Sequence, residues 1–194
     1  MTDYMHSAEI PSRFVRLPAA DVPEGRWATE TARRLAAQLD EYPAAEAQAA
    51  ALAAQLSGHA TVNNELKPHS GFALVRFPAN GVEAYLMFHQ LSKDGVASAE
   101  DLQRLDIHET PPVRPRETEF RVLPAGPALH SRSLLESSFN GMPCQLRAEE
   151  YFILNDKLSG ILVVHLQWAD PMLDEACAEV LHDIAGSVAV EPRA

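Results

Sequence analysis

In the last third of the chain, the spacing of hydrophobic residues changes from that of a strand to that of a helix. From Gly160 to Trp168 the residues are mostly apolar, and apolar side chains occupy both alternating faces, which predicts a strand covered on both sides. After Asp170 and Pro171 the apolar residues recur at every third or fourth position, which predicts an amphipathic helix. Its stripe consists of Leu173, Cys177, Val180, Leu181, Ile184 and Val188. The two segments together predict a helix laid across a sheet.

Alternating or continuous apolar runs predict further strands through most of the chain. A short run before Pro18 is typical of an edge strand, and Asn80-Gly81 supplies the positive φ angles that a hairpin turn needs. Because short turns join consecutive runs, we expect a mainly antiparallel sheet. The predicted strands cover residues 13–17, 72–77, 82–91, 119–123, 129–139, 145–154 and 158–168.

Helix-forming residues dominate between Trp27 and Leu56. Pro43 interrupts this segment, so the pattern fits either two helices or one kinked helix. A short helix capped by Ser98 is predicted through Leu105, and the proline-rich residues 106–117 predict an extended surface loop. We therefore expect an α+β fold in one globular domain over residues 1–194, with tails at 1–11 and 190–194.

The order of these elements resembles a known family. An early strand, an alanine-rich helical segment opening on Trp27, an antiparallel meander and the closing ILVVHLQWADPMLDEACAEVLHDIAGSV are similar to the Mog1/PsbP-like α/β/α sandwich. The likeness is closest to uncharacterised actinobacterial proteins of that type, and only residues 160–188 are close in pattern. The resemblance implies a small binding or accessory protein and supplies no motif from which functional positions can be transferred.

Charge and cysteine content limit the possible partners and compartments. The formal net charge of -11 repels phosphate backbones and argues against a nucleic-acid partner. Cys144 and Cys177 lie in separate apolar segments, so reduced thiols are expected. The first ten residues lack the pattern of a secretory signal, and no stretch has the roughly 18 apolar residues of a membrane span. We expect a cytoplasmic protein, with secretion that needs no cleaved signal as the open alternative.

Several residues are candidates for chemistry. Cys144 follows Pro143 at a turn, where a thiol beside a histidine can act as a nucleophile, although a buried structural cysteine is the commoner situation. His89 and His165 lie within apolar strands, where each imidazole must find a partner. If the sheet holds a pocket, these histidines with Gln167 and Tyr85 are expected to line it.

Other charged residues favour a protein surface over a metal or acid–base site. No two of the eight histidines are spaced three or four residues apart, so we expect no metal site and no cofactor. The adjacent carboxylates Glu149 and Glu150 point to opposite faces of a strand and do not form an acid–base pair. Arg114 and Arg116, in the proline-rich loop, are suited to an acidic partner.

Two hypotheses follow from these observations. The first is a non-enzymatic binding or assembly protein that holds another protein or a second copy of itself, because no convergent polar motif accompanies an ample core and an acidic surface. The second is a small-molecule-binding or hydrolytic protein with a site between sheet and helix, in which His89, His165 and Cys144 supply the reactive groups.

Overall fold

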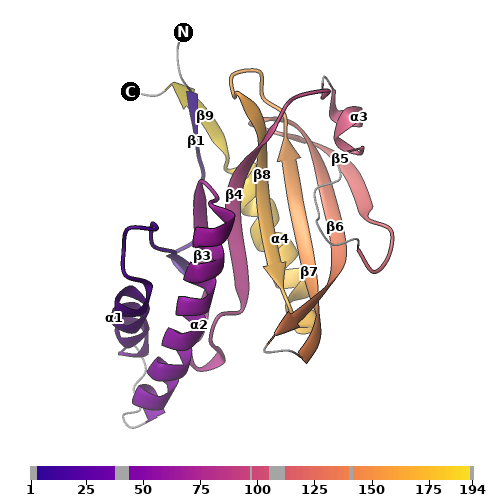
Figure 1. Cartoon of the computed structure of the whole chain (residues 1–194). Coiled ribbons are helices and arrows are strands. Elements are labelled where there is room, and N and C mark those ends of the chain that lie inside the picture. The colour runs from indigo at the N-terminus through magenta and orange to yellow at the C-terminus, as the bar shows by residue number, and fades with distance from the viewer. Residues whose placement is uncertain (1–3, 38–43, 97, 105–111, 140–141, 193–194) are drawn as a thin grey trace. The chain divides into compact units, whose positions relative to one another are not determined.

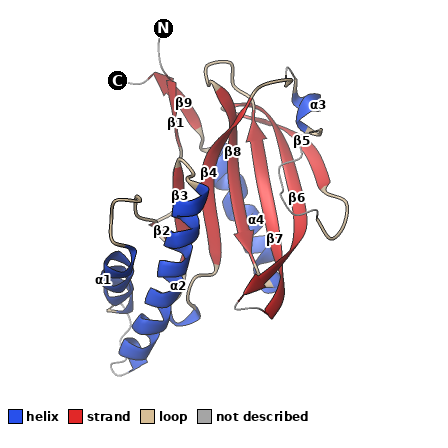
Figure 2. Cartoon of the chain, in the orientation of Figure 1, coloured by secondary structure: helices blue, strands red, loops and turns tan. Residues whose placement is uncertain are grey.

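The computed structural model describes residues 4–37, 44–96, 98–104, 112–139 and 142–192. The chain divides into two compact units, one made of residues 1–10 and 87–194 and the other of residues 11–86. Strand β4 (Ala84–Ser92) supplies residues to both units. The expected α+β class, with a mainly antiparallel sheet and flanking helices, is confirmed (Figure 1; Figure 2). The single domain stays a prediction.

The larger unit is built on an antiparallel meander of long strands. The meander consists of β5 (Glu117–Leu123), β6 (Gly126–Phe139), β7 (Met142–Ile153) and β8 (Gly160–Trp168), which lie in the order β8-β7-β6-β5 with β4 next to β8. Each consecutive pair is antiparallel, as the short turns predicted. The strand β8 is buried at every position except Gln167, which confirms a central strand. The bounds of all four strands lie within three residues of the predicted ones.

The helix α4 (Asp174–Gly186) covers one face of this sheet. It packs against β7 and β8, and Figure 1 shows it running behind those two strands. The 3-10 turn η2 (Pro171–Leu173) precedes α4, and the Asp170 carboxylate accepts a hydrogen bond from the Met172 backbone N–H at 2.9 Å. The predicted stripe is confirmed, since Cys177, Val180, Leu181, Ile184 and Val188 are buried while Leu173 is half-buried.

The short helix α3 (Ala99–Leu102) lies on the opposite face. Its Leu102 joins a buried cluster with Leu129, Phe152, Ile161 and Val163, side chains that point away from α4. Ser98 is the N-cap of α3 as predicted and forms a capping box with Asp101. The Asp101 carboxylate accepts hydrogen bonds from the Ser98 backbone N–H and hydroxyl, both at 3.0 Å. The helix ends before Leu105, which lies outside the described residues together with much of the predicted loop.

Two short strands near the ends of the chain also belong to the larger unit. The strand β1 (Tyr4–Ser7) pairs antiparallel with β9 (Ala189–Pro192). The His6 ring stacks on Phe88 with centroids 5.7 Å apart, and the Ser187 hydroxyl accepts a hydrogen bond from the Glu9 backbone N–H at 2.9 Å. Both segments expected to be tails therefore contribute strand residues.

The smaller unit joins two helices to short strands. The helices α1 (Glu24–Ala36) and α2 (Ala44–Leu66) pack along each other, and the small residues Ala28, Ala32 and Ala36 are buried. The Glu24 carboxylate links the helices by accepting hydrogen bonds from Thr61 and Asn64. The strands β2 (Phe14–Arg16) and β3 (Ser70–Leu74) are antiparallel, and β3 neighbours the start of β4.

Two local predictions for the smaller unit are wrong. Helix α2 does not end at Leu56 but continues to Leu66, through Gly58. Asn80-Gly81 does not form a two-residue hairpin turn, because Pro78–Asn80 form the 3-10 turn η1 and only Gly81 has a positive φ, of 78°. Proline fixes a φ that suits the start of such a turn. Whether the chain kinks or breaks at Pro43 lies outside the described residues, although two separate helices flank it.

Candidate functional site

A groove of about 940 Å³ opens between the sheet and helix α4 in the larger unit. Strands β5, β6 and β7 form its floor, and α4 forms one wall. The antiparallel register explains why polar residues gather there. His130 pairs with Tyr151, and Arg132 pairs with Glu149, so two residues from each strand face α4 side by side.

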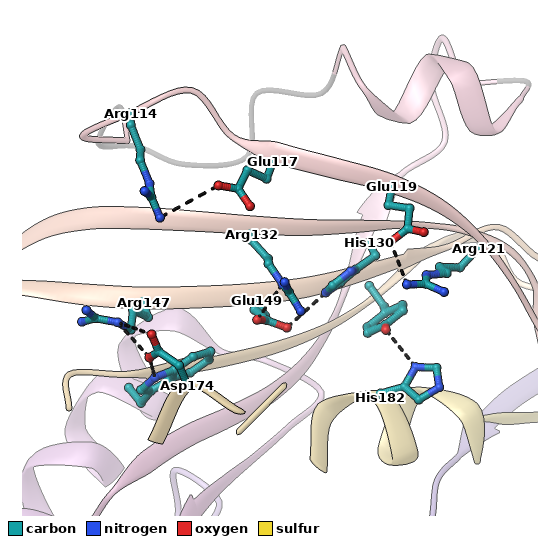
Figure 3. A network of polar contacts seen from close by, with 12 residues as sticks. Arg114, Glu117, Glu119, Arg121, His130, Arg132, Arg147, Glu149, Asp174 and His182 are labelled. Carbon is teal, nitrogen blue, oxygen red and sulfur yellow. Dashed lines mark hydrogen bonds and ion pairs between the residues drawn. The ribbon is translucent and has the colours of Figure 1, made fainter. Parts of the chain in front are cut away.

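Glu149 is the centre of the buried charge in this groove. One of its carboxylate oxygens lies 3.1 Å from His130 Nε2, and the other accepts from Arg132 Nε at 2.9 Å (Figure 3). An ionised carboxylate can only accept hydrogen bonds, so it pairs with the His130 tautomer that carries its proton on Nε2. The His130 and Glu149 side chains are each 8 % exposed, whereas Arg132 is 53 % exposed. Arg132 therefore brings a guanidinium, anchored at one end, to the surface of the groove.

Tyr151 connects this cluster to helix α4. Its ring stacks on His130 with centroids 4.6 Å apart and planes inclined by 17°. Its hydroxyl lies 3.0 Å from Nδ1 of the exposed His182 on α4 (Figure 3). Burial raises the pKa of the Tyr151 phenol, so this hydroxyl keeps its proton near neutral pH. The contact fixes one edge of α4 to the floor of the groove.

Asp174, the first residue of α4, makes a second connection between helix and sheet. Its carboxylate accepts hydrogen bonds from Trp168 Nε1 at 2.7 Å and from Arg147 Nε at 2.8 Å. A carboxylate at the start of a helix also interacts favourably with the helix dipole. Arg147 further donates to the Ala169 carbonyl at 3.2 Å. The start of α4 is thus held by side chains from β7 and β8.

Two more arginines line the groove, Arg121 on β5 and Arg114 three residues before the start of that strand. Arg121 pairs with Glu119 at 2.7 Å, and Arg114 lies 4.0 Å from Glu117 (Figure 3). Each of the four arginines that line the groove therefore has a carboxylate partner. The surface is polar, and its arginines occur in pairs with carboxylates. Such a lining suits an extended polar ligand better than a compact apolar one, because small-molecule pockets have mostly apolar walls.

His165 and Gln167 lie together, but on the face opposite to this groove. His165 Nδ1 is 2.8 Å from a Glu150 oxygen, and its Nε2 is 3.4 Å from Gln167 Oε1. Ser131, Glu150 and His165 form one row across three strands, and all three are buried. The carboxylate stands between the serine and the histidine, so the row does not have the order of a Ser-His-acid triad.

The other candidates from the sequence are dispersed. Tyr85 belongs to the smaller unit, where its hydroxyl donates to Asn63 at 3.1 Å and burial raises its pKa to about 12. His89 is half-buried in β4, and Cys144 is half-buried in β7 opposite Ser137. Of the two loop arginines, Arg114 lines the groove while Arg116 donates to the Gln103 carbonyl at 3.2 Å. The functional roles of these residues stay predictions.

Sequence reasoning missed the residues at the centre of the groove, His130, Glu149, Tyr151 and His182. A signal for three of them was present. A hairpin centred on Asn140-Gly141 places position 130 opposite 151 and position 132 opposite 149, and the pairing of Phe139 with Met142 shows this register. The opposite orientations of Glu149 and Glu150 were predicted correctly, but each carboxylate takes a histidine on its own face.

The described residues contain no cluster of three or more His, Cys, Asp or Glu side chains suited to a metal ion. In the same part of the chain, no helix has the length and apolar character to cross a membrane.

The comparisons with known proteins leave the family open. No protein-family model matches the chain, and no curated protein sequence matches it significantly. The crystal structure of LpqN, involved in cell envelope biogenesis of Mycobacterium tuberculosis, is similar with a TM-score of 0.45 and 11% sequence identity. The match covers 98% of this chain and 86% of LpqN. We infer nothing about function from a likeness of this degree.

Proposed function

We propose that this protein is a non-enzymatic binding or assembly protein that holds an extended, polar segment of another protein in the groove between β5–β7 and α4. The observation that carries the proposal is the pairing of each groove arginine with a carboxylate. A polypeptide offers amides and charges of both signs at regular intervals, so it can satisfy such a surface along its length.

Arg132 and Arg121 are the residues that we expect to contact the partner. Their side chains are 53 % and 45 % exposed, yet each is oriented by one carboxylate. A guanidinium has five N–H donors in a fixed plane, and a single carboxylate leaves some of them available. Preoriented donors of this kind lower the entropy cost of binding.

The family resemblance supports the same proposal. The Mog1/PsbP-like sandwich, to which the chain is similar in element order, consists mostly of small binding or accessory proteins. Neither Cys144 nor Cys177, both within the described residues, forms a disulfide. Reduced thiols are typical of a reducing compartment, so we propose that the binding takes place in the cytoplasm.

A small-molecule or hydrolytic site is the second candidate, and one observation favours it. The pairs His130 with Glu149 and Tyr151 with His182 lie next to each other in one groove, and such groups can transfer protons. This reading requires a nucleophile or an activated water beside them. Cys144, His89 and His165, the candidates from the sequence, do not line the groove.

Site-specific photocrosslinking tests the binding proposal. A photoreactive amino acid replaces Glu179, an exposed residue of α4 that lines the groove, and in a matched control replaces Arg34, an exposed residue of α1. We expect a partner protein to crosslink at position 179, not at position 34, and the yield to fall at least five-fold with Arg132→Glu. Equal crosslinking at both positions, or none at position 179, would contradict the proposal.

Thiol labelling separates the second candidate from the first. If Cys144 acts as a nucleophile, a thiol reagent at neutral pH labels it in the folded protein much faster than it labels free cysteine. The buried Cys177 serves as an internal reference in the same protein. We expect labelling of Cys144 at or below the rate of free cysteine, and faster labelling would favour the hydrolytic reading.

A further inference from the structure

The strand β5 forms one end of the sheet and is exposed along nearly its whole length. The residues from Glu117 to Val122 are all exposed, and only Leu123 is buried. Val122 is 90% exposed and Phe120 is 43% exposed. Natural edge strands are usually protected by proline, a bulge or charged side chains. The strand β5 contains no proline and pairs with β6 without interruption, and its charged residues are Glu117, Glu119 and Arg121, which carry both signs.

The backbone groups that face the free edge can be identified from Pro127. This proline pairs with Val122, has no N–H, and accepts a hydrogen bond from the Leu154 N–H with its carbonyl at 2.9 Å. Its backbone therefore faces β7 and makes no ladder bond with Val122. Because backbone direction alternates along a strand, Val122, Phe120 and Thr118 direct their N–H and C=O groups away from β6. Among the described residues, no further backbone bond engages these three.

The side chains of β5 complement those of a second β5. In an antiparallel pair centred on Phe120, Thr118 faces Val122 of the other copy and Phe120 faces its own counterpart. Glu119 then faces Arg121 of the other copy, and the reverse contact follows from symmetry. Since Glu119 and Arg121 already pair within one strand at 2.7 Å, the four charges form a square of alternating sign.

Shifting the register by one step removes this match. A pair centred on Glu119 sets two glutamates opposite each other, and a pair centred on Arg121 sets two arginines opposite each other. Like charges directly opposite destabilise a strand pair, so the charges select one register. The charges also indicate the binding partner. The strand whose charges match those of β5 is a second copy of β5 that runs in the opposite direction.

We propose that two copies of this chain associate through antiparallel pairing of their β5 strands about a two-fold axis at Phe120. The hydrogen bonds form between the outward groups of Thr118, Phe120 and Val122, and the Phe120 and Val122 side chains become buried across the axis. One seven-residue strand offers a small interface, which belongs to the weak and reversible class, below about 1,200 Å² in total. This inference does not depend on the ligand of the groove.

Charge reversal in the purified full chain tests the proposal by sedimentation over a range of concentrations. The wild type is expected to change from monomer to dimer as its concentration rises through the micromolar range. Arg121→Glu sets only glutamates opposite one another, and Glu119→Arg sets only arginines opposite one another. Each variant is expected to weaken self-association at least ten-fold.

A mixture of the two single variants and a double variant control for misfolding. Mixing the Arg121→Glu and Glu119→Arg proteins places each arginine opposite a glutamate, so the mixture is expected to form a heterodimer. The double variant Glu119→Arg with Arg121→Glu restores the alternating square and is expected to self-associate like the wild type. A wild type that stays monomeric up to millimolar concentration would overturn the proposal. So would single variants that dimerise unchanged, or a mixture of folded variants that gains no affinity.

Discussion

Glu149 is the residue on which the geometry of the groove depends most directly. Replacing it by alanine leaves buried His130 without its acceptor and releases Arg132. We expect Glu149→Ala to lower the free energy of unfolding by about 1–3 kcal/mol, the usual cost of leaving a buried polar group unpaired. Glu117→Ala is the matched control. Its carboxylate is 64% exposed and 4.0 Å from Arg114, so a change within about 0.5 kcal/mol is expected.

Urea denaturation of the two variants beside the wild type measures this difference. Equal unfolding free energies for Glu149→Ala and Glu117→Ala would show that the buried cluster does not stabilise the fold. If Glu149→Ala lowers the free energy of unfolding and leaves the m-value unchanged, the substitution changes stability without changing how compact the unfolded state is.

His59 makes the stability of the smaller unit depend on pH. Burial lowers the pKa of this imidazole from its usual 6.5, and its ring lies 5.7 Å from that of Tyr85. The folded state therefore binds the proton less readily than the unfolded state, so the stabilisation is present above pH 6.5 and is lost as the pH falls through the lower folded pKa. We expect His59→Gln to lose less stability than the wild type between pH 7.5 and pH 5.

Chemical denaturation at both pH values checks the sign. His69→Gln serves as a control, because this histidine is exposed and lies in the same unit as His59. If the wild type and His59→Gln lose the same stability on acidification, burial of His59 is not the cause.

At the scale of elements, two glycines are expected to respond to alanine in opposite directions. Gly126 begins β6 with a φ of 139°, and a Cβ there would lie 2.2 Å from the Leu154 carbonyl oxygen. Gly126→Ala therefore forces strain into the β5–β6 hairpin and is expected to cost about 1–3 kcal/mol. Gly58 lies inside α2 with no atom within 4 Å of an added Cβ. Gly58→Ala is expected to stabilise the helix by about 0.5–1 kcal/mol.

Thermal unfolding of the two variants tests this contrast. A stabilising Gly126→Ala would contradict the close approach of the β5–β6 turn to Leu154. A destabilising Gly58→Ala would mean that this turn of α2 contacts something at Gly58.

The elements that sequence could predict are those whose signals are local. The strands of the meander and the stripe of α4 follow from alternation and from three-and-four spacing, and their ends differ by few residues from the prediction. The pairing of β1 with β9 joins residues more than 180 positions apart, and nothing in either short segment indicates the other. The 3-10 turn at Pro78–Asn80 was not predicted, because Asn80-Gly81 is typical of a hairpin turn and the preceding Pro78 was not taken as the start of a different turn.

The groove was unpredictable for a related reason. Its histidines are scattered in the sequence, and they come together only through the register of β6 with β7 and the docking of α4. The register was available from the Asn140-Gly141 turn, but the position of His182 required knowing which face α4 covers. The pocket around His165 was a conditional expectation. The imidazole pairs with Glu150, which is the kind of partner that a histidine within an apolar strand was expected to need.

At the scale of the whole molecule, the boundary between the two units falls within the strand β4. Ala84, Tyr85 and Leu86 belong to the smaller unit, and the strand continues into the larger unit with buried Met87 and Phe88. If one unit unfolds alone, the strand is interrupted between the buried residues Leu86 and Met87, and unpaired backbone groups at a buried position are costly. We therefore predict that residues 11–86 and 87–194 unfold together, as a single domain does.

The two tryptophans make this prediction measurable, because each unit holds one. Trp27 lies in α1 and Trp168 in β8, so Trp168→Phe reports on the smaller unit and Trp27→Phe on the larger. Within each variant, the urea transition seen by fluorescence should coincide with that seen by far-ultraviolet circular dichroism, which averages over both units. Loss of the Trp168 hydrogen bond to Asp174 shifts the midpoint of one variant, but it shifts both probes equally if unfolding is cooperative. Separated transitions in either variant would mean that β4 does not couple the units and that the chain comprises two domains.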